Sequence, residues 1–115
     1  MTNSVIIKEK IGRFNKVISV SGDKSISIRC VLLASQAIGK SRIYNLLESE
    51  DVINSLRVIK KLGINYIKKK NFYEINGYGL DGFLTRKNLT LFAGNSGTLA
   101  RLILGLLVNL SLIHI

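Results

Sequence analysis

Two glycine-containing turns hold the residues whose chemistry is most informative. The first offers the ammonium of Lys24, the hydroxyl of Ser25 and the guanidinium of Arg29, directly after Gly22. Ser25 and Arg29 are four positions apart, so they share a face if the segment is helical. Unpaired backbone N–H groups and the helix dipole attract anions to a helix N-terminus. The three side chains could converge on one phosphate or carboxylate; the alternative is a solvated helix start.

The second turn has the sequence Gly94-Asn-Ser-Gly-Thr98 and precedes a strongly apolar stretch. Its glycines permit backbone conformations in which successive N–H groups point into one concavity. The amide of Asn95 and the hydroxyl of Thr98 add polar contacts beside Gly97. Arg101 could either join such a site or tie the helix to its neighbours. The alternative is an ordinary lead-in to a helix with no ligand.

Hydrophobic periodicity and turn residues predict the elements that position both turns. Alternating strands and helices are typical of an α/β unit whose helices bury one face against a sheet. The two strands after the second helix are separated by lysines and closed by Asn76-Gly77, a pattern typical of a hairpin. The expected order is strand Val17–Val20, helix Lys24–Gly39, strand Arg42–Asn45, helix Ser49–Gly63, strands Ile64–Ile67 and Phe72–Ile75, a loop at 79–88, strand Leu89–Phe92 and a helix from about Leu99.

The helix expected over Ser49–Gly63 has the strongest local signals. Ser49 is a cap-forming residue, acidic residues occupy the first turn and lysines the last turn, and Gly63 is a typical C-terminal residue. We expect one face to pack inward and the opposite face to point to solvent. The inward residues are Val52, Leu56, Ile59 and Gly63, and the outward residues are Arg57, Lys60 and Lys61.

The chain of 115 residues has a net charge of +10, and 47% of its residues are hydrophobic. That hydrophobic share is typical of one small globular domain. The charge suggests a small basic nucleic-acid-binding module as an alternative, because clustered cations release counterions from phosphates. The lysines at 60–61 and 68–70 are not interleaved with aromatic stacking residues, which favours a solvated basic surface. Part of this charge could attract small anionic substrates.

Several other classes lack support in the sequence. Cys30 is the only cysteine, so no internal disulfide is expected, and with no export signal the cytoplasm is the default compartment. The apolar stretch at 99–115 is interrupted and falls short of the roughly 20 residues that cross a bilayer, which predicts a buried helix. His114 and Cys30 support neither a metal site nor a Cys–His nucleophile. Ala34–Ser41 lacks the first glycine of a P-loop.

Four motifs in order resemble the EPSP synthase family, between about residues 17 and 107. The family pattern Gly-(Asp/Ser)-Lys-Ser-x-Ser-x-Arg is matched from Gly22 to Arg29, before an Ala/Leu-rich helix. Asn45–Asp51 resembles Asn-Leu-Leu-x-Ser-x-Asp, and Leu62-Gly63 resembles the family's Leu-Gly. Gly94–Thr98 with Arg101 resembles Gly-Asn-(Ala/Ser)-Gly-Thr-x-x-Arg. Four ordered motifs are more specific than any one of them.

The resemblance implies an incomplete α/β fold, the βαβαββ unit of the enolpyruvyl transferases, whose two halves form an inside-out α/β barrel. Residues 1–21 would hold a first strand belonging to the other globular half, and residues 22–115 an incomplete substrate-binding half. The ending after Val108 does not resemble the family's continuation, which suggests truncation or a reading-frame break. We therefore expect an N-terminal fragment that is inactive alone, with the catalytic carboxylate and lysine of the family lying downstream.

The resemblance also implies a reaction, the transfer of the enolpyruvyl group from phosphoenolpyruvate to the 5-hydroxyl of shikimate 3-phosphate, with release of phosphate. Lys24 would contact both substrates, Ser25 and Arg29 would hold shikimate 3-phosphate, and Asn95, Gly97 and Thr98 would line the phosphoenolpyruvate site. No metal, organic cofactor, nucleic acid or membrane partner is implied, and the family is typically monomeric. A sister transferase family acting on UDP-N-acetylglucosamine is disfavoured, since that family has Lys-Asn where this chain has Lys24-Ser25.

Overall fold

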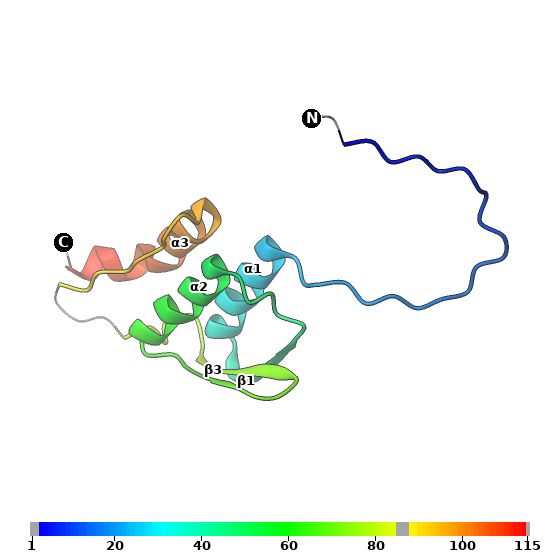
Figure 1. Ribbon diagram of the computed structural model, residues 1–115. Coiled ribbons are helices and arrows are strands. Elements are labelled where there is room, and N and C mark those ends of the chain that lie inside the picture. Colours follow the sequence, from blue (N-terminus) through cyan, green and yellow to red (C-terminus); the bar gives the residue numbers. More distant parts are fainter. Residues whose placement is uncertain (1–2, 85–87, 115) are drawn as a thin grey trace.

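Two helices cover one face of a three-stranded antiparallel sheet, and a third helix lies beside them (Figure 1). The computed structural model describes residues 3–84 and 88–114, with only the backbone described for 109–114. The expected loop at 79–88 therefore lies partly outside the described residues. The described elements are α1 Lys24–Gln36, β1 Ile38–Tyr44, α2 Glu50–Lys61, β2 Asn65–Lys68, β3 Phe72–Tyr78 and α3 Gly97–His114.

The sheet order is β1-β3-β2, and the central strand β3 runs antiparallel to both neighbours. β1 and β2 are consequently parallel to each other, and α2 is the crossover between them. The inward side chains of β3, including Tyr73 and Ile75, pack against the helices. This order is a βαβαββ unit that lacks its first strand. It confirms the predicted α/β class and the predicted incomplete unit.

Helix α1 begins where the sequence predicts and ends earlier. The Asp23 carboxylate accepts a hydrogen bond from the Ile26 N–H group at 2.8 Å and caps the helix. The prediction that the helix continues to Gly39 was wrong, because Ile38 pairs with Tyr78 and starts β1. Sheet pairing with β3 outweighs the local helical pattern there. It also extends β1 beyond the strand expected at Arg42–Asn45, over all of Ile38–Tyr44.

Helix α2 confirms the predicted inward and outward faces. Val52, Leu56 and Ile59 are buried in the core, whereas the cationic residues expected to face solvent are exposed. Ser49 occupies the N-cap position, but its hydroxyl makes no capping hydrogen bond, so the expected cap is wrong in that detail. The helix ends before Gly63, whose φ is +89°. Asn54 and Ser55 are also buried, which periodicity of apolar residues alone did not predict.

The predicted hairpin is present as β2 and β3. Its second strand is longer than expected, because Asn76 and Gly77 pair with Lys40 and Gly39 of β1 instead of closing the hairpin. β3 therefore has partners on both sides over most of its length. β3 is therefore the central strand of the sheet, and β1 and β2 are its edge strands.

Two predicted strands are absent. Residues 17–20 are not paired, and Val17 is 100% exposed. Figure 1 shows this N-terminal segment running away from the helices and the sheet. Residues 89–92 form no strand either; Leu89 and Leu91 pack against the core, and the Thr90 carbonyl accepts a hydrogen bond from Lys61 Nζ at 3.0 Å. A β-branched or apolar run becomes a strand only where another strand offers hydrogen-bond partners.

Helix α3 buries one face rather than its whole surface. Leu99 and Ile103 lie in the core, whereas Leu104 and Val108 are exposed. The expectation of a buried helix is therefore confirmed for one face only. Within the described part of the chain, none of the helices combines the length and the apolar character that spanning a membrane needs.

Candidate functional site

The first turn places its cations on two different sides of α1. Lys24 Nζ forms an ion pair with Asp51 Oδ2 at 3.2 Å, so the first turns of α1 and α2 lie together. Ser25 is half-buried, and Arg29 is exposed one turn further along. Within the described residues, no hydrogen bond or ion pair joins Lys24, Ser25 and Arg29 to one another. The structure therefore does not bring the three side chains together, and their convergence on one anion stays a prediction.

Gly22 sets the position of the first turn by its small size. A Cβ at this position would collide with the backbone carbonyl oxygen of Asn45. The Asn45 amide in turn donates to the Val20 carbonyl at 3.1 Å, and the Leu47 N–H group donates to Ser27 Oγ at 3.1 Å. The segment that follows β1 thus holds the turn from one side. A side chain at Gly22 would force these two segments apart.

The second turn is held from behind by α2. Gly94 has a φ of +59°, and a Cβ there would lie 2.5 Å from Nδ2 of Asn54. Ser96 is 5% exposed, and its hydroxyl caps α3 by accepting a hydrogen bond from the Leu99 N–H group at 3.1 Å. Asn95 lies on the outer side of the same turn and is exposed. The backbone geometry of this turn is therefore fixed by contacts on its inner side, while its outer side faces solvent.

The remaining residues predicted for the second turn lie at the start of α3. Gly97 is the first residue of the helix, is exposed, and has open space where a side chain would be. Thr98 is half-buried, and Arg101 is exposed one turn later. Exposed N–H groups of a first helical turn can bind an anion at this position. The structure assigns no ligand role to these residues, and their roles remain predictions.

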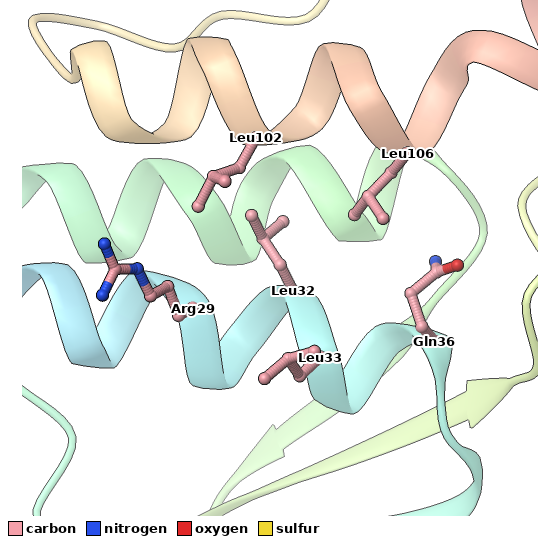
Figure 2. A pocket seen from close by; sticks show the side chains of 6 residues that line it. All are labelled: Arg29, Leu32, Leu33, Gln36, Leu102 and Leu106. Carbon is pink, nitrogen blue, oxygen red and sulfur yellow. The ribbon is translucent and has the colours of Figure 1, made fainter.

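Both turns lie at the same end of the helical layer. The colours of Figure 1 show that α1 and α3 begin at neighbouring ends and run in the same direction, and Figure 2 shows the same arrangement from close by. The Lys24–Asp51 ion pair places the start of α2 at this end as well. The N-termini of α1 and α3 therefore direct the positive ends of their dipoles to one region, whereas Glu50 and Asp51 offset the dipole of α2. This arrangement favours binding of more than one anionic group.

Arg29 stands at one end of an apolar groove between α1 and α3. Figure 2 shows its guanidinium near the N-terminal ends of the helices, with leucine side chains following along the groove. The groove itself is apolar, so a charged ligand would be drawn to the arginine end only. The other lining residues are Leu32, Leu33, Gln36, Leu102 and Leu106.

Sequence reasoning missed three residues around these turns. Asp51 holds the Lys24 ammonium, and its place at the end of the Asn45–Asp51 motif was the available signal. Asp23 caps α1, which its position directly before the helix could have indicated. Asn54 contacts Gly94 from α2, and no sequence pattern marks this contact. Each of the three orients a turn rather than supplying a cation.

A polar cluster behind the first turn joins the segment that follows β1 to the sheet. It consists of Glu48, Lys68 and Tyr73. Lys68 Nζ lies 2.7 Å from Glu48 Oε1, and the Tyr73 hydroxyl donates to the same oxygen at 2.9 Å. The hydrogen bond from Lys68, followed by that from Tyr73, lowers the pKa of Glu48 below its ordinary value. Burial, and secondly the bond to Glu48, raises the pKa of Tyr73. The hydrogen bond that Lys68 donates to Glu48 also raises the pKa of Lys68.

The basic surface is partly neutralised within the sheet. Arg42 Nε lies 3.3 Å and Lys40 Nζ 3.6 Å from the carboxylate of Glu74 on the neighbouring strand. The Arg42 guanidinium also lies 5.2 Å from the centre of the Phe72 ring. These cations are held by groups of the chain itself, which reduces the field available to a long polyanion.

The fold and the two turns define the class first: an incomplete α/β unit in which two glycine-containing turns each lead into a helix. The EPSP synthase (3-phosphoshikimate 1-carboxyvinyltransferase) family profile matches residues 8–114. Proteins named 3-phosphoshikimate 1-carboxyvinyltransferase from Streptococcus suis and Streptococcus pyogenes are 39% and 42% identical over 103 residues. The solved EPSP synthase from Acinetobacter baumannii matches with a TM-score of 0.71 and 33% identity, over 78% of this chain and 20% of that one.

The chain belongs to the EPSP synthase family. Its alignments with the two streptococcal proteins each cover 90% of this chain and 24% of the relative. A third relative, from Sulfurihydrogenibium, is 39% identical over 88% of this chain and 23% of its own length. The chain therefore spans about a quarter of the length of these relatives.

Proposed function

We propose that this chain forms part of the substrate cradle of a 3-phosphoshikimate 1-carboxyvinyltransferase. The complete enzyme transfers the enolpyruvyl group of phosphoenolpyruvate to the 5-hydroxyl of shikimate 3-phosphate. The single observation that carries the proposal is the presence of two motif-bearing turns at the starts of α1 and α3, at one end of the helical layer. Both substrates are phosphorylated carboxylates, so a region with two helix N-termini offsets their mutual repulsion.

In this proposal the first turn binds shikimate 3-phosphate. Ser25 and Arg29 hold that substrate, and Lys24 contacts both substrates. The Lys24–Asp51 ion pair supports this role, because it keeps the ammonium at the mouth formed by α1 and α2. Asp51 is the more enclosed partner, with its side chain 16% exposed against 54% for Lys24. The lysine can therefore turn toward an incoming anion while the carboxylate stays in place.

The second turn binds phosphoenolpyruvate. Gly97 leaves open space at the start of α3, where backbone N–H groups can approach a phosphate or carboxylate closely. The side chains of Asn95 and Thr98 border the same helix start. No acidic side chain occupies the first turn of α3, so that turn itself carries no carboxylate to oppose an anion.

The chemistry proceeds by addition and elimination. A proton is added to the methylene carbon of phosphoenolpyruvate while the 5-hydroxyl oxygen bonds to the adjacent carbon. The 5-hydroxyl group gives up its proton to a base as this bond forms. The tetrahedral intermediate then loses a proton from the former methylene group and expels phosphate, which restores the double bond. The proton donors and acceptors belong to the rest of the enzyme. The residues of this chain orient the two anions, which lowers the entropic cost of bringing them together.

We further propose a compartment, an oligomeric state and a set of partners. The enzyme acts in the cytoplasm as a monomer and has neither a nucleic-acid nor a membrane partner. The pairing of Lys40 and Arg42 with Glu74 supports the absence of a polyanion partner. A DNA-binding titration at increasing salt tests this point, since tight binding that weakens steeply with salt would favour the nucleic-acid module instead.

A chimeric enzyme tests the proposed function. The 103 matched residues of the Streptococcus suis relative are replaced by those of this chain, and phosphate release from phosphoenolpyruvate is measured with shikimate 3-phosphate. We expect turnover in the chimera, and its loss after Lys24→Met. A folded chimera without turnover would contradict the proposal. The isolated chain should show negligible turnover, because it spans only about a quarter of the length of its relatives.

A further inference from the structure

Asn54 is a polar residue on the buried face of α2, and nothing described so far explains its polarity. It is 2% exposed, and within the described residues its Nδ2 atom has no hydrogen-bond partner. A buried amide donor without an acceptor costs roughly 1–3 kcal/mol, so such a group needs an explanation. An apolar residue of similar volume would avoid this cost. The amide therefore points to a role other than stability.

The neighbouring arginine fixes the orientation of this amide. Arg57 Nη1 donates a hydrogen bond to Asn54 Oδ1 at 3.5 Å. A guanidinium has only donors, so the oxygen of the amide must face Arg57. The NH₂ group then faces the opposite direction. That direction is the inner side of the second turn.

The contact with the second turn is close. A Cβ on Gly94 would lie 2.5 Å from Asn54 Nδ2, so the backbone of Gly94 rests directly against the NH₂ group. Gly94 adopts a φ of +59°, which sets the direction of the chain into Asn95 and the cap residue Ser96. The positive end of a buried amide dipole therefore lies directly behind a proposed anion site. In a low-dielectric interior this dipole acts with little screening.

We propose that Asn54 is a positioning residue of the second turn, which fixes Gly94 and adds positive potential behind the phosphoenolpyruvate-binding backbone. This inference rests on the proposed function and extends it to a residue of another helix. Asn54 touches neither substrate; it acts through the turn. A purely structural core residue would influence stability alone, whereas a positioning residue influences the anion affinity of one turn and spares the other.

Two substitutions and one matched control test the role of Asn54. Asn54→Leu keeps the volume and removes the amide, and Asn54→Asp keeps the shape and replaces the donor with a carboxylate. Asn65→Asp makes the same charge change at an exposed position of β2. The first measurement is amide hydrogen exchange in the free chain. We expect the hydrogen-bonded amides of Ser96 and Leu99 to exchange about tenfold faster in Asn54→Leu, and to be unchanged in the control.

The second measurement is the affinity of each variant for phosphoenolpyruvate, followed by NMR through the amide shifts of the second turn. We expect the dissociation constant to rise about threefold in Asn54→Leu and about tenfold in Asn54→Asp, because a carboxylate repels the anion. Binding of shikimate 3-phosphate at the first turn should be unchanged. If Asn54→Asp does not fold, Asn54→Leu alone decides.

The two measurements separate the inference from the function on which it rests. Unchanged exchange and unchanged phosphoenolpyruvate affinity in Asn54→Leu would overturn the role of Asn54 and leave the proposed function intact. If the unsubstituted chain does not bind phosphoenolpyruvate at the second turn, the proposed second site is wrong. Faster exchange in Asn54→Leu would then still support the positioning of the turn by Asn54, and unchanged exchange would reject it.

Discussion

The two turns differ in the chemical groups that they offer to the proposed anionic substrates. In the first, the groups that can attract an anion are side chains, Lys24 and Arg29, and both are exposed. In the second, the groups that we propose for anion binding are mainly backbone N–H groups at the start of α3, and the turn is fixed from behind by α2. Both turns nevertheless contain a glycine pressed against an asparagine of the intervening segment: Gly22 on Asn45 and Gly94 on Asn54.

This difference predicts different sensitivities. A side-chain site loses affinity when a cation is removed, but its backbone stays in place. A backbone site loses affinity when its conformation changes, even if no charge is altered. The first turn should therefore respond to charge and salt, and the second turn to steric changes at glycine.

The largest effect is expected from Gly94→Ala. The added Cβ meets the buried Asn54 amide at 2.5 Å, and the φ of +59° strains any residue with a side chain. We expect a loss of about 2–4 kcal/mol of unfolding free energy, measured by urea denaturation, together with loss of phosphoenolpyruvate binding. Gly105→Ala is the control, because it has open space in the middle of α3 and should stabilise the helix by about 0.5–1 kcal/mol. Equal stability of the two variants would contradict the account.

A smaller and more selective effect is expected from Arg29→Met. Removal of a guanidinium that holds a phosphate should weaken shikimate 3-phosphate binding by about ten- to a hundredfold, because hydrogen bonds to charged groups contribute roughly 1.5–3 kcal/mol. The unfolding free energy should change by less than about 0.5 kcal/mol, since the residue is exposed. Arg13→Met removes the same charge from the exposed N-terminal segment and serves as the control. Equal losses of affinity in both variants would indicate a general charge effect rather than a site.

Asp51→Asn tests whether the Asp51 carboxylate competes with a bound anion for the Lys24 ammonium. The carboxylate lies 3.2 Å from the ammonium and competes with an incoming anion. We expect shikimate 3-phosphate to bind about two- to fivefold more tightly to the variant, with a stability change of less than about 1 kcal/mol. Calorimetric titration measures the affinity. A weaker complex would show that the positioning of Lys24 by Asp51 outweighs the competition of Asp51 with the ligand.

The smallest effect concerns the cluster behind the first turn, which has no described counterpart behind the second. The lowered pKa of Glu48 means that its contribution to stability is present above the pKa of the unfolded chain. That contribution is lost as the pH falls through the folded-state pKa. In Lys68→Met we expect the Glu48 pKa, followed by carboxyl carbon NMR, to rise toward its ordinary value. An unchanged pKa would show that Lys68 does not hold this carboxylate.

The raised pKa of Tyr73 makes stability depend on pH in the opposite direction. Its neutral form is favoured in the folded chain, so its contribution to stability is present below the unfolded pKa and is lost as the pH rises through the folded one. Glu48→Gln removes the neighbouring negative charge and should lower the Tyr73 pKa in an ultraviolet titration. Because burial is the larger cause, the pKa should remain above the ordinary tyrosine value.

Much of the fold follows from local signals in the sequence. The caps and periodicity of α2 locate that helix to within a residue or two, and the two strand segments on either side of the lysine run locate the hairpin. The errors arise where the chain depends on partners. Ile38 leaves the helical pattern because β3 offers hydrogen bonds, and Val17 remains exposed because no strand is paired with it. Local pattern cannot supply that information.

The candidate site was predictable to a similar extent. The turns and their cations are visible as residue types at fixed spacing. The groups that hold the turns are not, because Asp51 and Asn54 come from α2 and reach the turns only through the packing of α2 against its neighbours. Contacts between distant segments need coordinates, and a buried Asn on an otherwise ordinary helix gives no signal in one sequence.

A two-ligand NMR titration tests the central claim most directly. Shikimate 3-phosphate and phosphoenolpyruvate are added separately to the isotope-labelled chain, and the backbone amides are followed. The account predicts that shikimate 3-phosphate shifts the amides from Gly22 to Arg29, and that phosphoenolpyruvate shifts those from Gly94 to Thr98. Equal shifts from both ligands centred on Lys68–Lys70, with neither turn affected, would contradict it and would leave only a basic surface.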